Sequence, residues 1–158
     1  MKAMHLACVL CAALFSTLAG AKAIIGVYEN ASIPEFDLTL KAKIDTGARH
    51  SSLHAENIKL FKKEDRQWVS FSTKNDKGEL VSFTKPVHRI AKIKRHNGVS
   101  QQRPVIITNI CIANTLYIAE INLIDRSALN YPMLIGRSYL KHNFLVDVSE
   151  KYTKKPQC

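Results

Sequence analysis

An alternating strand that runs straight into an Asp-Thr-Gly turn constrains this sequence more than any other feature. Apolar and polar residues alternate over residues 38–44, which is the period of a half-buried β-strand. Asp45, Thr46 and Gly47 follow at once, and glycine lets the backbone turn sharply. A carboxylate at the end of a packed strand is held rigidly, as a catalytic acid must be. Asp45 is therefore the first candidate for a functional residue.

A second segment near the C-terminus strengthens this interpretation. Between Tyr131 and Leu140, the apolar pair Leu134-Ile135 precedes Gly136-Arg137. An Asp-Thr-Gly-Ala turn followed later by two apolar residues and Gly-Arg resembles the retropepsins, a family of aspartic proteases. More specifically, residues 26–147 are similar to the bacterial retropepsin-like aspartic endopeptidases that are often labelled ATP-dependent zinc proteases. The other matching motifs are Ser51-Ser52-Leu53-His54-Ala55, Arg103-Pro104, Asp125-Arg126 and Phe144-Leu145-Val146-Asp147.

The resemblance implies an all-β fold, a retropepsin-like closed barrel with one short C-terminal helix, and aspartic endopeptidase activity. It also implies that Asp45, Thr46 and Gly47 form the catalytic turn, in which Thr46 hydrogen-bonds across a pair of aspartates and Gly47 admits the substrate backbone. The substrate-binding residues that it implies are Ala48, His54, Ile135, Gly136 and Arg137. This chemistry needs no cofactor and no metal ligand.

Aspartic proteolysis needs two carboxylates that share one proton, because like charges about 3 Å apart cannot both ionise. The chain contains one Asp-Thr-Gly, so a symmetric homodimer in which each subunit donates Asp45 is the economical arrangement. In a single-chain alternative, Asp125 or Asp147 would supply the second carboxylate. Classical retropepsins often have an acid soon after the turn that pairs with the late arginine. Arg49-His50 stand there in this sequence, so we expect Arg137 to pair with Asp147 or Asp125.

Two histidines leave a metal-dependent alternative open. His50 and His54 are four residues apart, which suits two metal ligands on one helix face, but the zinc-protease motif needs Glu directly after the first histidine and the sequence has Ser51. As a structural residue, His54 would be a partly buried hydrogen-bonding side chain beside the turn. Nothing resembles a glycine-rich phosphate loop followed by Lys-Ser/Thr, so ATP binding has no support.

Many short strand patterns separated by turns agree with the all-β expectation. Residues 67–73 and 80–87 predict a hairpin with its turn at 74–79, and His96-Asn97-Gly98 predicts the turn of a second hairpin between 87–93 and 99–107. Either hairpin tip is a candidate for the flap that closes over substrate in retropepsins. The remaining expectations are strands at 24–28, 51–53, 103–112, 115–124 and 144–148, a loop at 30–37, a helix at 137–142 and a frayed tail from Ser149.

The N-terminus has the layout of a secretory signal peptide. Lys2 precedes an apolar run from Leu6 to Leu18, which is too short to span a bilayer comfortably, and small residues at 19–23 suit cleavage. An uncleaved membrane anchor is the alternative. We therefore expect a signal peptide (1–23), one protease domain (24–150) and a polar tail (151–158) in a periplasmic or secreted protein. After cleavage Cys111 and Cys158 remain, which leaves two alternatives, a disulfide between them or a buried free thiol at Cys111.

The net charge of +10 favours acidic partners. The basic residues are scattered without aromatic interleaving, and export also argues against nucleic acid. We therefore expect a peptide or protein substrate and a second copy of the chain as partners. Besides an aspartic endopeptidase, the alternatives are a non-catalytic peptide-binding module on the same fold and a zinc-dependent protease that uses His50 and His54.

Overall fold

A computed structural model describes residues 22–94 and 100–158 of the chain. In chain order the elements are β1 (Ala23–Ile25), β2 (Tyr28–Ile33), the 3-10 helix η1 (Pro34–Phe36), β3 (Leu38–Asp45), β4 (Ser51–His54), β5 (Glu56–Lys63), β6 (Arg66–Lys74), β7 (Leu80–Pro86), β8 (Arg89–Lys94), β9 (Ser100–Ile112), β10 (Thr115–Ile124), β11 (Met133–Gly136), α1 (Arg137–Asn143) and β12 (Phe144–Val146). The expected all-β class with one short helix near the C-terminus is confirmed. No helix in the described part of the chain is long and apolar enough to cross a membrane.

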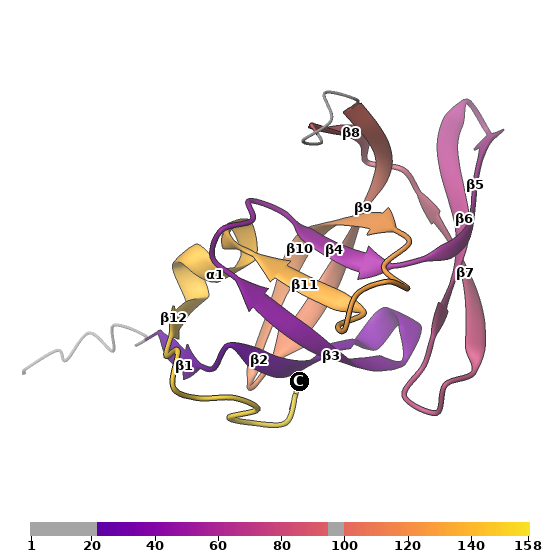
Figure 1. The fold of residues 1–158 in the computed structure, drawn as a ribbon. Coiled ribbons are helices and arrows are strands. Elements are labelled where there is room, and N and C mark those ends of the chain that lie inside the picture. Colours follow the sequence, from indigo (N-terminus) through magenta and orange to yellow (C-terminus); the bar gives the residue numbers. More distant parts are fainter. Residues whose placement is uncertain (1–21, 95–99) are drawn as a thin grey trace, which may run out of the picture.

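The main sheet closes into a ring (Figure 1). Its strand order is β10-β4-β11-β3-β2-β9-β8, and β9 also pairs with β10, which closes the strands from β10 to β9 into a ring and leaves β8 as an additional strand on β9. The alternating burial of β3 shows why the ring forms, since every second residue from Leu38 to Ile44 points into the core. The parallel pairing of β3 with β11 brings the two informative segments of the sequence together, with Asp45 opposite Gly136.

The core lies inside this ring and under α1. It consists mostly of aliphatic side chains such as Ile106, Ile121 and Leu123, all fully buried. Tyr139 of α1 is also buried, and its hydroxyl donates to the carbonyl of Ile110 at 2.9 Å. The helix is therefore fixed against the β9–β10 hairpin, which places the first turn of α1 beside the end of β3.

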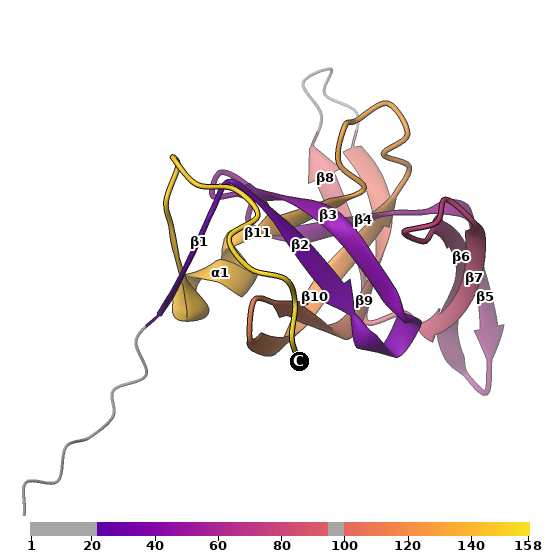
Figure 2. The same cartoon turned by 90° about the horizontal axis from the view of Figure 1, so that it is seen from below.

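A second sheet, β5-β6-β7, stands to one side of the ring (Figures 1 and 2). Phe36 of η1 connects the two sheets, because its ring stacks on Phe83 at 4.4 Å and meets the edge of Phe71 at 6.0 Å. The expected β6–β7 hairpin is confirmed. The expected turn His96-Asn97-Gly98 lies outside the described residues, although β8 and β9 pair in antiparallel fashion on either side of it.

The C-terminal tail is held against the ring, and the expectation that it frays is wrong. Glu29 is fully buried, and its carboxylate accepts hydrogen bonds from the backbone of Gly26 and from the amide and hydroxyl of Thr153. The tail then ends in a disulfide between Cys158 and Cys111. A polar composition therefore did not mean a loose segment here, because the partners of the tail lie on β2 and β9.

Two other local expectations were wrong. Residues 30–33 continue strand β2 instead of starting a loop, and Gly26 separates β1 from β2 within the single strand expected at 24–28. Strand β5 was not anticipated at all, because its residues are mostly exposed and show no clean alternation.

Candidate active site

The turn after β3 fixes the carboxylate of Asp45. Its Oδ1 atom accepts hydrogen bonds from the backbone N–H groups of Gly47 at 2.9 Å and Ala48 at 3.1 Å. Asp45 is half-buried, whereas Thr46 and Gly47 are exposed. The side chain thus stands at the surface in one orientation, and no hydrogen bond or ion pair connects it to a second carboxylate within the described residues.

The end of β11 and the start of α1 pack against this turn and the residues that follow it. The backbone N–H of Arg137 donates to the carbonyl of Ala48 at 2.9 Å, and that of Ser138 donates to Arg49 at 3.0 Å. A Cβ atom on Gly136 would come within 2.6 Å of the backbone of His50. Only glycine allows this approach, which explains why Gly precedes Arg in the second motif.

Arg137 pairs with no acid among residues 22–94 and 100–158, so the expected ion pair with Asp147 or Asp125 is wrong. Its Nη1 atom donates to the carbonyls of Thr46 and Gly47, both at 2.8 Å. Asp147 instead accepts hydrogen bonds from Ser149, and Asp125 accepts one from Ser127. Each carboxylate therefore accepts hydrogen bonds within its own local turn, and this arrangement does not support either acid as the second carboxylate of a single-chain site.

Ile135 and His54, two of the expected substrate-binding residues, lie inside the protein. Ile135 is 0% exposed and pairs with Ile44, so it packs beneath the turn and cannot touch a substrate. His54 is 7% exposed, and its Nδ1 atom accepts the backbone N–H of Arg126 at 2.9 Å. Its Nε2 atom therefore carries the proton and donates to Glu56 at 3.0 Å. His54 acts as the hydrogen-bonding structural residue described above.

The histidine arrangement does not favour a zinc site. β4 runs as an extended strand from Ser51 to His54, and a strand rises about 3.3 Å per residue. His50 and His54 are thus carried apart, and they face different groups, with Glu120 near His50 and Arg126 near His54. Residues 22–94 and 100–158 contain no cluster of three His, Cys, Asp or Glu side chains suited to a metal ion.

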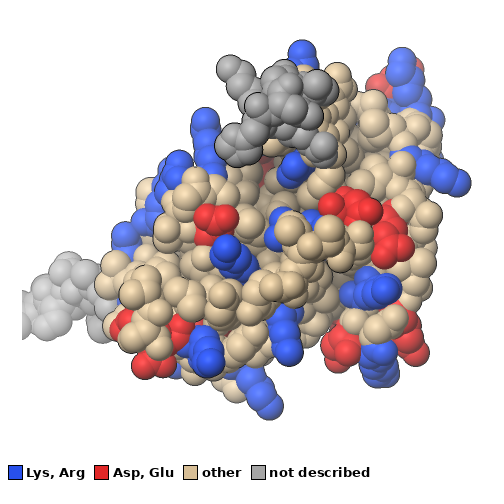
Figure 3. Space-filling model, viewed as in Figure 1, with Lys and Arg blue, Asp and Glu red and all other residues tan. Residues whose placement is uncertain are grey.

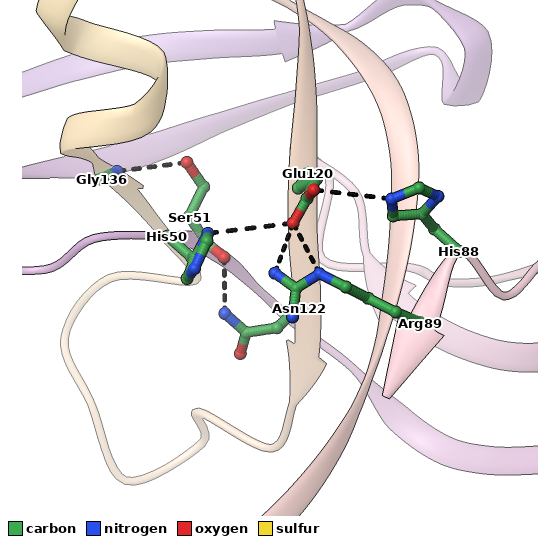
Figure 4. A network of polar contacts seen from close by, with 7 residues as sticks. All are labelled: His50, Ser51, His88, Arg89, Glu120, Asn122 and Gly136. Carbon is green, nitrogen blue, oxygen red and sulfur yellow. Dashed lines mark hydrogen bonds and ion pairs between the residues drawn. The ribbon is translucent and has the colours of Figure 1, made fainter. Parts of the chain in front are cut away.

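A network of polar contacts connects the end of β11 and the start of β4 to β8 and β10 (Figure 4). Ser51 accepts the N–H of Gly136 on its hydroxyl, and Asn122 donates to the carbonyl of Ser51 at 2.6 Å. Nearby, Glu120 is hydrogen-bonded to Arg89 and lies 3.5 Å from His88. The hydrogen bond from Arg89 lowers the pKa of the Glu120 carboxyl below its ordinary value.

The pKa of His50 is also lowered. Burial is the largest cause, followed by the positive charge of Arg89, and the charge of Glu120 opposes both. The bend that follows the candidate catalytic turn therefore carries a histidine for which the charged form is disfavoured, within a group of cationic side chains.

Two cationic residues near Asp45 were missed as candidates for substrate binding. Lys43 lies on the same face of β3 as Asp45, two residues earlier. Arg126 is close enough for the charge of Asp45 to act on it, although burial, the main cause, and Arg103 lower the pKa of its guanidinium. Both line a hollow of about 310 Å³ together with Tyr28, Leu129, Asn130, Tyr131 and Leu134. The period of β3 could have identified Lys43, but the position of Arg126 depends on tertiary structure.

The basic residues are spread over the face seen in Figure 3. Several Lys and Arg side chains lie beside one another at the upper left of this view, and over the rest of the face they are mixed with Asp and Glu.

Comparisons with known proteins agree on the region that carries the turn. A family model described as RimB-like, retropepsin-like aspartic endopeptidase RimB, matches residues 24–157. The crystal structure of a Legionella pneumophila protein of unknown function (DUF785) has a TM-score of 0.72 to this chain at 33% identity, and it covers 85% of this chain and 100% of that one.

Curated relatives carry a different name. Proteins named probable alpha-L-glutamate ligase from Shewanella pealeana and Desulfotalea psychrophila are 36% and 35% identical to this chain over 135 and 131 residues. The matches cover 83% and 80% of this chain but 30% and 28% of those proteins. The chain thus spans less than a third of the length of these relatives, and their name describes proteins much larger than the matched segment.

Proposed function

Because this chain belongs to the RimB-like family of retropepsin-like aspartic endopeptidases, we propose that it hydrolyses peptide bonds with Asp45 as its catalytic carboxylate. The observation that carries the proposal is the turn after β3, where two backbone N–H groups hold Oδ1 of Asp45 at the surface. A carboxylate fixed in this way needs no reorganisation when a substrate arrives.

The reaction follows from two such carboxylates that share one proton. The ionised aspartate takes a proton from a bound water, and the resulting hydroxide attacks the carbonyl carbon of the peptide bond. The protonated aspartate donates a hydrogen bond to the carbonyl oxygen and stabilises the negative charge that develops there. The amine leaves after it accepts a proton from the dyad.

The second carboxylate is Asp45 of another copy of the chain. One subunit offers a single surface aspartate of this kind, and a symmetric dimer brings two together on its axis. The sheet of β1 and β12 supports this assembly, because Ile24 and Leu145 lie opposite each other and are 59% and 55% exposed. A short sheet with apolar side chains in water is a suitable surface for a second copy.

The substrate in this proposal is an acidic peptide. Lys43 and Arg126 place two positive charges beside Asp45, where they would pair with carboxylates of a bound chain. The curated relatives that match this segment are named probable alpha-L-glutamate ligase, a name that also refers to glutamate. The net charge of +10 adds a general attraction for such chains.

We also propose that the protein acts outside the cytoplasm. The apolar run at residues 6–18 with small residues after it supports export. The disulfide between Cys111 and Cys158 fits an oxidising compartment.

The experiment is the change Asp45→Asn, which keeps the shape of the side chain and removes the titrating group. Purified wild-type protein is expected to cleave a fluorogenic peptide that contains consecutive glutamates, with inhibition by pepstatin and no effect of EDTA. Asp45→Asn is expected to lower kcat by at least about 10³-fold, because a carboxamide can neither take a proton from the attacking water nor give one to the leaving amine.

Three results would contradict parts of the proposal. Full activity of Asp45→Asn would remove Asp45 from the mechanism, and inhibition by EDTA would favour a metalloprotease. Binding of the peptide by wild-type protein with no cleavage at any pH would identify a peptide-binding module instead. Circular dichroism and thermal unfolding of Asp45→Asn serve as the folding control.

A further inference from the structure

One edge of β10 is not covered by another strand over part of its length. β10 pairs with β9 from Thr115 to Asn122, whereas on its other edge it pairs with β4 only from Ile121 to Ile124. Over Leu116–Glu120, this second edge therefore has no strand partner among the described residues. An open edge of this kind can accept an extended peptide as an additional strand.

A hollow of about 630 Å³ lies between this open edge and the start of α1. One wall consists of Ile118, Ala119 and Glu120, which belong to the part of β10 that pairs with β9 on one edge only, and Ile118 is 58% exposed. The remaining lining residues are Arg49, His50, Arg137, Ser138, Tyr139 and Lys141. The volume is in the range of typical ligand pockets, about 300–1,000 Å³.

The charged side chains at this hollow are mainly cationic. Neither Arg49 nor Lys141 has an acidic partner within the part of the chain that the structure describes, and Arg137 bonds only to carbonyl groups there. The carboxylate of Glu120 is already hydrogen-bonded to Arg89. A chain with carboxylate side chains would therefore be attracted to the hollow and would find cations that are still available.

His50 also lines the hollow, and one of its ring nitrogens provides an independent observation. Within the described residues, its Nδ1 atom is buried without a hydrogen-bond partner and lies 3.9 Å from Glu120. Burial is the largest cause of its lowered pKa, the charges of Arg89 and Arg49 add to it, and the charge of Glu120 opposes them.

We propose that the hollow beside the open edge of β10 binds an acidic peptide segment in an extended conformation, at a second site next to the Asp45 turn. The peptide backbone pairs with the edge at Leu116–Glu120, and its carboxylates meet Arg49 and Lys141. Arg137 lies between the two sites, because its guanidinium holds the carbonyls of Thr46 and Gly47. The proposal rests on the proposed function only for the acidic nature of the ligand, since binding at this hollow requires no cleavage.

The test uses Asp45→Asn protein and a fluorescein-labelled hexaglutamate peptide at about 0.15 M salt, where long-range attraction is largely screened. Ile118→Asp and Ile118→Lys place opposite charges at the same exposed rim position. Fluorescence anisotropy is expected to show a dissociation constant at least about fivefold higher for Ile118→Asp than for Ile118→Lys. Lys141→Ala is expected to weaken binding about threefold, as for an exposed ion pair.

Lys62→Ala is the matched control, because it removes an equal charge from β5 on the separate sheet and is expected to leave binding unchanged. Equal affinities of the two Ile118 variants, or equal losses in Lys141→Ala and Lys62→Ala, would overturn the proposal. Unfolding temperatures that match the parent protein show that each variant is folded. Since every arm lacks Asp45, a failure of the proteolytic mechanism would not change these outcomes.

Discussion

In the part of the chain that the structure describes, the guanidinium of Arg137 binds backbone carbonyls of the candidate catalytic turn and no carboxylate. Its Nη1 atom bonds to the carbonyls of Thr46 and Gly47, while its own N–H bonds to Ala48. These contacts surround the two N–H groups that orient Asp45. At the scale of a single residue, the arginine is a positioning residue whose effect reaches the reaction through the turn.

Replacing Arg137 with alanine is expected to lower kcat about tenfold or more while the fold is retained. The side chain is exposed, so little packing is lost, but the turn loses two charge-assisted hydrogen bonds. Arg137→Lys is expected to recover part of the activity, because both bonds come from one nitrogen and an ammonium can donate to two acceptors. Steady-state kinetics of the three proteins check this, and an alanine variant with unchanged kcat would contradict it.

The partner of Arg137 could not be predicted from the sequence, and the burial of Ile135 was missed, whereas the buried hydrogen-bonding role of His54 was one of the two alternatives that the sequence left open. Every residue has a backbone carbonyl, so the residue types do not reveal which carbonyls accept a hydrogen bond from Arg137. Acidic side chains were therefore the partners that the sequence suggested. Ile135 was read by analogy as a substrate contact, yet its register with Ile44 places it in the core. Asp45 itself was accessible to sequence reasoning, because strand period and turn chemistry are both local.

At the scale of elements, the strands with a buried face were predicted well and those without one were not. β3, β6, β9 and β10 alternate or are long and apolar, and their positions agree with the structure. β5 is a mostly exposed edge strand, so its position depends on pairing with β6. The tail also depends on distant partners, because Glu29 and Cys111 hold it in place.

The β1–β12 sheet gives a prediction at this scale. Leu145→Asp is expected to weaken dimerisation by about tenfold or more, because a charge would replace an apolar side chain that is 55% exposed in the isolated subunit and would become buried in a dimer. Sedimentation velocity over a range of concentrations measures the change. Leu80→Asp is the matched control, since Leu80 is 50% exposed on β7 of the separate sheet; equal behaviour of the two variants would remove β1–β12 from the interface.

For the whole molecule, acid is expected to reduce stability through several carboxylates. Hydrogen bonds from Arg89, Ser127 and Ser149 lower the pKa values of Glu120, Asp125 and Asp147, respectively. The unfolded chain therefore binds more protons than the folded one as pH falls below about 4.5, the ordinary glutamate value. Urea unfolding from pH 7 to pH 3 should show a declining free energy of unfolding, with a smaller decline in Glu120→Gln. An equal decline in both proteins would exclude a contribution from Glu120.

The proposed dimer would make activity depend on concentration. If each subunit carries half of a dyad, specific activity is expected to rise with protein concentration until dimers saturate. The proposed reaction needs one general base and one general acid, so the rate should be bell-shaped in pH.

Mixing gives the sharpest test of a shared site. If subunits exchange freely, a ninefold excess of Asp45→Asn chains leaves about one tenth of the wild-type subunits in wild-type dimers, because partners are then chosen by mass action. Specific activity per Asp45-bearing subunit should therefore fall about tenfold. In the matched mixture with a ninefold excess of Asp76→Asn, a change in the exposed β6–β7 turn, every chain carries Asp45, so specific activity per Asp45-bearing subunit should stay unchanged. A rate that depends neither on concentration nor on added Asp45→Asn would mean that each subunit holds both catalytic groups. The second carboxylate would then have to be sought within the same chain, by testing Asp125→Asn and Asp147→Asn in the same assay.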